Sequence, residues 1–105
     1  MEQINISARH GHISEATQGK IREKLEKLPR LYDRIMAIEL TIDLEHRETP
    51  SVDLKVLVKH KPDFLASTSA ADLMSAVDEV IEKILQQLRK HKGKDQDRQR
   101  GASSR

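Results

Sequence analysis

Residues 72–94 read DLMSAVDEVIEKILQQLRKHKGK, and this stretch decides the fold. Its apolar residues recur at the spacing of one face of an α-helix. They are Leu73, Val77, Val80, Ile81, Ile84 and Leu88. A helix over the whole stretch is roughly 30 Å long, because each residue adds about 1.5 Å. A chain of 105 residues forms one domain with a single modest core, and we expect this helix to cover that core.

A second row on the same helix is basic. Lys83, Lys90 and Lys94 follow one flank beside the apolar stripe, with Gln87 between them. Acidic residues come earlier and the basic run 89–92 comes last, an order that suits the helix macrodipole. The row is therefore either an ordinary solvated helix end or a binding surface.

The rest of the chain alternates between apolar and polar residues, as β-strands do. We expect strands over residues 3–9, 35–44, 52–59 and 64–70. Their inward side chains are expected to be Ile4, Ile6, Ala8, Met36, Ile38, Leu40, Ile42, Leu44, Val52, Leu54, Val56, Val58, Phe64, Ala66, Thr68 and Ala70. Because each strand has one apolar face, the sheet should have one buried and one wet face.

Another helix is expected between the first two strands. Ser14 is a suitable N-cap, and Pro29 should end the helix near Leu28. Its inward stripe is Thr17, Ile21, Leu25 and Leu28, and a basic row beside it is Lys20, Lys24 and Lys27. The order β-α-β-β-β-α predicts an α+β domain, a four-stranded mixed sheet with both helices on one face. The two lysine rows would then line a common groove.

The charge is unevenly distributed. Residues 1–88 carry 12 Lys and Arg against 15 Asp and Glu, whereas residues 89–105 carry 7 against 2. A basic end on a mildly acidic domain indicates attraction to a polyanion. Only two aromatic residues, Tyr32 and Phe64, are present, so single-stranded RNA has almost no stacking platform. Any RNA binding should use backbone and shape.

Nothing in the sequence argues for catalysis. There is no G-x-S-x-G motif, no P-loop and no Gly-rich dinucleotide turn. There is also no cysteine for a disulfide or a thiolate metal site. His10 and His12 form an H-x-H in a turn, but the sequence offers no obvious third ligand. We expect a binding protein without enzymatic activity, cofactor or metal.

The sequence has no segment that suits a membrane. No apolar run approaches the length of a membrane span, and residues 1–10 lack a signal-peptide core. We therefore expect a cytoplasmic protein with no membrane partner. Residues 95–105 are polar and lack an apolar period, which predicts a disordered basic tail.

Four segments resemble one protein family. They are residues 4–16, with its I-S-E-A end, KIREKLEKL at 20–28, FLASTSAADLMSAVD at 64–78 and EKILQQLRKHK at 82–92. Over residues 3–94 the chain resembles the bacterial ribosome hibernation factors. These are the hibernation-promoting factor and ribosome-associated inhibitor A family, also called the sigma-54 modulation or S30EA ribosomal protein family. At Ala8-Arg9-His10 this chain departs from the glycine and the following basic or amide residue that members often have.

The resemblance implies a ribosome-binding domain over residues 1–94, similar to double-stranded RNA-binding domains. It implies a translation inhibitor that occupies the mRNA/tRNA channel of the small subunit in stationary phase or stress. Partners would be 16S rRNA, 70S ribosomes and 100S ribosome dimers, with the protein a monomer off the ribosome. The chain matches the short type, which lacks the dimer-forming second domain. Carried over by position, the rRNA contacts are Arg9, Lys20, Arg22, Lys24, Lys27, Lys83, Arg89, Lys90, His91, Lys92 and Lys94.

Two other functions stay open. The sigma-54 modulation name suggests a protein-interaction regulator of transcription, whose contact surface would be the wet sheet face around Glu39, Asp43, Lys55 and Lys59. A general double-stranded RNA-binding module would instead bind naked duplex. The salt dependence of the affinity distinguishes phosphate binding from protein binding. Phosphate contacts release counterions, so the affinity they provide falls steeply as the salt concentration rises.

Overall fold

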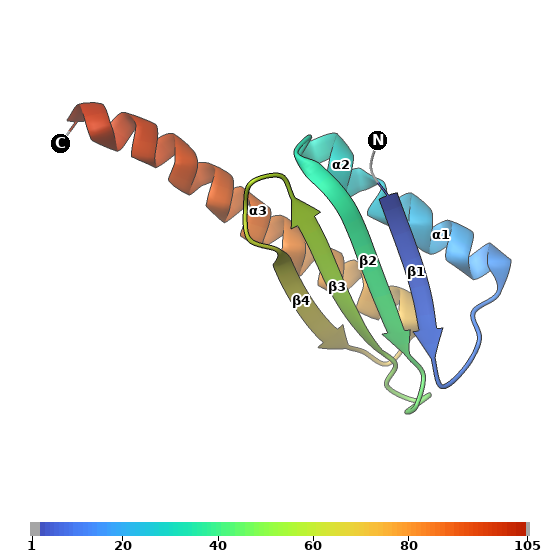
Figure 1. Cartoon of the computed structure of the whole chain (residues 1–105). Coiled ribbons are helices and arrows are strands. Elements are labelled where there is room, and N and C mark those ends of the chain that lie inside the picture. The colour runs from blue at the N-terminus through green and yellow to red at the C-terminus, as the bar shows by residue number, and fades with distance from the viewer. Residues whose placement is uncertain (1–2, 105) are drawn as a thin grey trace.

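The computed structural model describes the backbone of residues 3–104 and the side chains of residues 3–90. Figure 1 shows the elements in chain order. They are β1 (Gln3–Arg9), α1 (Glu15–Leu25), α2 (Lys27–Leu31), β2 (Ile35–Asp43), β3 (Ser51–Val58), β4 (Phe64–Ser69) and α3 (Leu73–Ser104). The predicted β-α-β-β-β-α arrangement is confirmed, with the short helix α2 prolonging α1.

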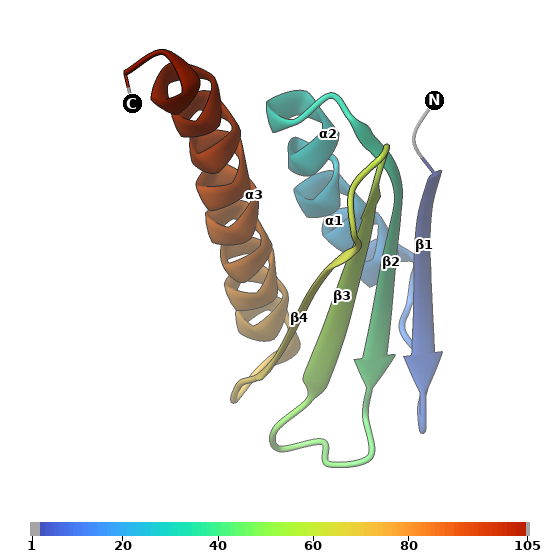
Figure 2. The same ribbon diagram turned by 60° about the vertical axis from the view of Figure 1, so that its left-hand side comes forward.

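The four strands form one mixed sheet in the order β1-β2-β3-β4. β1 and β2 are parallel, with α1 and α2 in the connection between them, and the other neighbours are antiparallel hairpins. Figure 2 shows α1 and α3 on the same face of the sheet, while the opposite face is uncovered. This arrangement fixes which helix flank meets which strand.

The core lies between the sheet and the helices, as the apolar stripes predict. Its buried side chains come from α1, α2, β2, β3 and α3. They include Ile21, Leu25, Leu28, Ile38, Leu40, Ile42, Val52, Leu54, Val56, Val77, Val80, Ile81, Ile84 and Leu88. The edge strands β1 and β4 contribute only partly buried side chains, such as Ile4, Ile6 and Phe64. The central strands therefore carry the sheet's share of the core.

The start of β2 departs from the predicted alternation. Met36 was expected inside but is 56% exposed, whereas Ile35 is buried at 5% exposure. The pairing of β2 with β3 shifts register between Ile35 and Ala37, as a β-bulge does. The extra residue turns Ile35 into the core and Met36 outward. Ala8, also expected inside, is exposed on the edge strand β1.

The helix after β1 continues further than Pro29 suggests. Ser14 caps α1 as predicted, because its Oγ accepts a hydrogen bond from the backbone N–H of Thr17. α2 then places Pro29 in its first turn, after Lys27 and Leu28. The first N–H groups of a helix have no partner within the helix, so a proline there loses no hydrogen bond.

The last helix is also longer than predicted, because its backbone remains helical beyond Lys94 up to Ser104. Residues 95–100 contain neither glycine nor proline, and Gln and Arg there are good helix formers. Side chains after Lys90 lie outside the described residues, so the division into a domain over 1–94 and a disordered tail over 95–105 stays a prediction. Within the described part of the chain, no helix has the length and apolarity needed to cross a bilayer.

Candidate nucleic-acid interface

One flank of α3 runs along the free edge of β4. Lys83 Nζ donates a hydrogen bond to the Ser67 carbonyl oxygen at 2.8 Å, and Gln87 Nε2 donates to the Leu65 carbonyl oxygen at 2.8 Å. We call Lys83, Gln86, Gln87 and Lys90 the β4-side flank. With Ala66 and Ser67 these four residues line an open hollow of about 490 Å³. Ammonium and amide donors therefore gather in one concave place.

The opposite flank of α3 faces α1. There Lys24 Nζ of α1 lies 2.8 Å from Asp78 Oδ1, and Arg89 lies 3.5 Å from Glu82 on α3 itself. A small cavity of about 170 Å³ follows, lined by Leu31, Tyr32, Leu85, Leu88 and Arg89. The seam between the helices is therefore a mixture of acidic, basic and apolar side chains.

The predicted common groove is consequently wrong. Lys83 and Lys90 lie on the β4 side of α3, whereas Lys24 faces α3 from the other side. The helical period places a basic row beside an apolar stripe, but it does not say which flank meets the neighbouring helix. Strand order decides that, because α3 packs on β3 and β4 while α1 packs on β1.

The far flank of α1 borders the other edge of the sheet. Arg22 donates from Nη1 to the Ile4 carbonyl oxygen of β1 at 3.2 Å. A hollow of about 360 Å³ lies here, lined by Ile4, Arg22, Glu26, Pro29 and Arg30. Both free strand edges therefore receive a hydrogen bond from a cationic side chain of a helix.

Some of the predicted rRNA-contact residues already have a hydrogen-bond or ion-pair partner within the protein, and others do not. Lys24, Arg22, Lys83 and Arg89 have the protein partners described above. Among the described residues, no hydrogen bond or ion pair involves the side chains of Lys20, Lys27 and Lys90, which are exposed.

Arg9 is exposed at the end of β1, opposite Asp43 in register. The side chains of His91, Lys92 and Lys94 lie outside the described residues.

Lys83 can still bind a phosphate although it bonds to β4, because its ammonium group has three donors and the Ser67 carbonyl oxygen uses one.

Asp72 fixes the start of α3 and therefore the position of its flanks. Its carboxylate accepts hydrogen bonds from the Ser75 hydroxyl at 2.7 Å and the Ser75 backbone N–H at 3.1 Å. These two bonds, the hydroxyl first, lower the pKa of Asp72 below its ordinary value of 3.8. A charged carboxylate also suits the positive end of the helix macrodipole.

Two residues that line the hollows beside β4 and β1 were not among the contact residues predicted from the sequence. Gln86 lines the hollow on the β4-side flank, and Arg30 lines the one beside β1. Gln86 lies three residues after Lys83, a spacing at which helical side chains are neighbours, so the helical period could have identified it. Arg30 follows Pro29, where the sequence predicted no helix.

Comparison with known proteins places the chain in a family. The model of the family described as sigma 54 modulation protein / S30EA ribosomal protein matches residues 4–96. The ribosome hibernation promoting factor of Escherichia coli (strain K12) is 32% identical over 92 residues, covering 88% of this chain and 95% of that protein. The factor of the same name from Azotobacter vinelandii is 28% identical over 99 residues, covering 94% and 91%.

Solved structures agree on the fold. A ribosomal subunit interface protein from Coxiella burnetii matches with a TM-score of 0.77 at 23% identity, over 87% of this chain and 98% of that one. The N-terminal domain of Thermus thermophilus Protein Y matches with a TM-score of 0.72 at 18% identity, over 83% and 94%. The fold is thus that of small α+β domains with two helices on one sheet face. The chain belongs to the sigma 54 modulation protein / S30EA ribosomal protein family.

Proposed function

We propose that this protein is a ribosome hibernation factor. It binds 16S rRNA in the mRNA/tRNA channel of the small subunit and keeps ribosomes inactive in stationary phase or stress. Family membership supports this proposal, as do the relatives named ribosome hibernation promoting factor. The proposed setting is the cytoplasm, and the protein is a monomer until it meets 70S ribosomes or their 100S dimers.

The observation that carries the proposal is the β4-side flank of α3. Lys83 and Lys90 border one hollow together with the amides of Gln86 and Gln87. Such donors suit phosphate and ribose oxygens, which position a protein on RNA without reading its sequence. The two aromatic residues, Tyr32 and Phe64, are partly buried against the core and offer little stacking surface. Recognition would therefore depend on the shape of one folded RNA.

A matched pair of variants tests the proposal. Lys90→Gln removes one cation from the β4-side flank, and Lys59→Gln removes one exposed cation beyond the end of β3. Binding to 30S and 70S particles is measured by co-sedimentation at several salt concentrations. Lys90→Gln should weaken binding and reduce the log–log salt slope by about 0.7–1, the share of one phosphate contact.

Lys59→Gln should leave both the affinity and the salt slope unchanged. The reverse pattern would favour the regulator that binds through its sheet face. Equal affinity for naked duplex RNA and for ribosomes would instead favour a general double-stranded RNA-binding module. Neither alternative has a specific observation in its favour. On the uncovered face, the polar side chains of Lys55 and Asp53 already pair with Asp63 and Ser67.

Inhibition should follow from occupancy alone. Titrating the protein into an in vitro translation reaction should stop synthesis at a stoichiometric ratio to ribosomes, and excess initiation components should restore it. Substoichiometric and irreversible loss of activity, or cleaved rRNA, would indicate an enzyme and contradict the proposal.

A further inference from the structure

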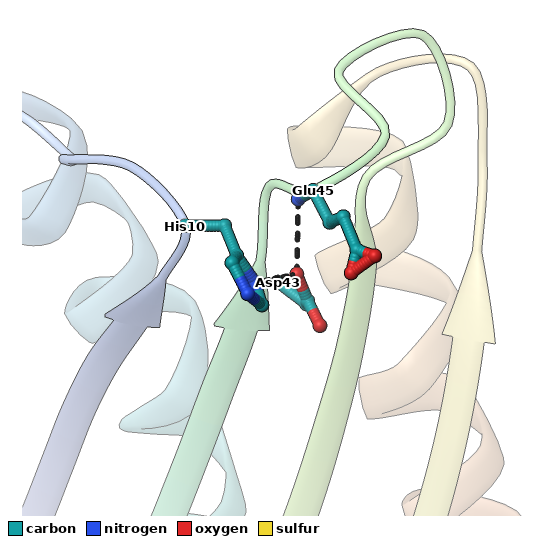
Figure 3. Close-up of side chains that lie close together, drawn as sticks. All are labelled: His10, Asp43 and Glu45. Atoms are coloured by element: carbon teal, nitrogen blue, oxygen red, sulfur yellow. Dashed lines mark hydrogen bonds and ion pairs between the residues drawn. The ribbon is translucent and has the colours of Figure 1, made fainter.

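A cluster of side chains with metal-binding chemistry lies away from the basic helix flanks. Figure 3 shows His10, Asp43 and Glu45 close together where β1 and β2 end. The sequence offered His10 only as half of an H-x-H with His12. The structure supplies Asp43 from the end of β2 and Glu45 from the turn after it, because β1 and β2 are parallel and finish side by side.

The ligand atoms are close enough to share an ion. His10 Nδ1 lies 2.9 Å from Asp43 Oδ1, and one ligand atom from each of the three residues lies within 4.8 Å of the others. His46 lies beside the cluster without belonging to it, with Nε2 4.0 Å from Glu45 Oε1. The side chain of His10 is 50% exposed, so an ion can enter from solvent.

The scaffold under the cluster is well defined. The backbone N–H of Leu44 donates to the Arg9 carbonyl oxygen at 2.9 Å, which joins the two strand ends. A Cβ at Gly11 would lie only 2.8 Å from Leu44 Cδ1, so the two turns pack closely. Asp43 is also held in place, because the backbone N–H of Glu45 donates a hydrogen bond to its Oδ1 at 2.9 Å. Ligands held on joined backbone segments need little rearrangement to bind.

We propose that His10, Asp43 and Glu45 bind one divalent transition-metal ion of the Zn²⁺ type. An imidazole nitrogen combined with carboxylate oxygens suits Zn²⁺, whereas Mg²⁺ and Ca²⁺ prefer oxygen ligands alone. The ion would take the place of the proton between His10 and Asp43. Bonds of about 2.0–2.1 Å in a tetrahedral site place two ligand atoms about 3.3 Å apart, so a small side-chain rotation is enough.

The site does not depend on the proposed ribosome binding. The strand ends lie at the end of the molecule opposite the C-terminal half of α3 (Figure 1). Metal binding should therefore be measurable on the isolated chain, without ribosomes. Failure of either proposal leaves the other intact.

The experiment is a Zn²⁺ titration of the metal-free full chain by calorimetry, followed by the same titration of two histidine variants. His10 and His60 both have positive φ, 60° and 62°. Asparagine tolerates this conformation better than most residues, so His10→Asn and His60→Asn are matched in backbone effect. His60 lies between β3 and β4, outside the cluster.

The chain should bind one Zn²⁺ at this cluster, and Mg²⁺ should not compete. Loss of an outer-shell partner alone weakens metal sites about 10–100-fold, so His10→Asn should weaken binding at least tenfold. Asp43→Asn should act similarly, while His60→Asn should match the unaltered chain. A proton NMR titration should move the imidazole signals of His10 before those of His60. No binding at millimolar Zn²⁺, or unchanged affinity in His10→Asn, would overturn the proposal.

Discussion

Ile84 is the residue on which the phase of α3 depends. Its side chain is fully buried in the core, whereas Gln86, two residues further along the helix, is exposed. Ile84→Ala should lower the free energy of unfolding by about 2–5 kcal/mol, because it removes buried methyl groups and leaves a cavity. Gln86→Ala is the control and should change it by less than about 0.5 kcal/mol. Urea unfolding measures both, and equal midpoints would contradict the helix phase.

Asp72 makes the stability depend on pH. Its pKa is lowered in the folded chain by the hydrogen bonds from Ser75. Its contribution is therefore present above the unfolded value, about 3.8, and is lost as the pH falls through the lower folded value. Asp72→Asn keeps a capping oxygen but does not titrate. Between neutral pH and a pH well below 3.8, the unaltered chain should lose more stability than Asp72→Asn, and parallel profiles would contradict this.

At the scale of the element, the helices protect the sheet edges as well as its face. A free strand edge can pair with another chain unless something covers it. Lys83 and Gln87 bond to carbonyl oxygens of β4, and Arg22 bonds to one of β1. Lys83 thus has a structural role in addition to its proposed role with rRNA. The sequence did not indicate this structural role.

Removing both edge bonds of β4 should expose that strand to self-association. We expect Lys83→Ala with Gln87→Ala to form dimers or larger species in light scattering at high protein concentration. The control is Gln86→Ala with Lys90→Ala, because these residues have the same chemical types on the same helix. Neither of them bonds to β4 in the described part of the chain. Equal behaviour of the two double variants would show that the edge needs no such protection.

The elements themselves were largely predictable because their signals are local. The apolar periods identified four strands and the buried stripe of α3, and Ser14 marked the start of α1. One error arose where strand pairing overrides the local pattern, and another where a proline falls in the first turn of a helix. The bulge that turns Met36 outward depends on the register with β3, and Pro29 sits within α2 because it falls in a first turn.

At the scale of the whole molecule, the sequence could predict basic rows but not how they face each other. The lysines of α1 and α3 were expected to share a groove, yet strand order places them on different sides of α3. The His10 cluster was missed for a similar reason, since Asp43 is the last residue of β2 and Glu45 follows that strand, both far along the chain from His10. Sites assembled across parallel strand ends leave no local spacing to detect.

The edge strand β1 has a consequence for local unfolding. It buries no side chain completely and pairs with only one strand, whereas β2 and β3 supply the sheet's part of the core. Detaching β1 therefore exposes little apolar surface and costs less free energy than global unfolding. In native-state hydrogen exchange, the amides of β1 should exchange through this partial opening, well before those of β2 that pair with β3. Equal protection of β1 and β3 would mean instead that the sheet opens only as one cooperative unit.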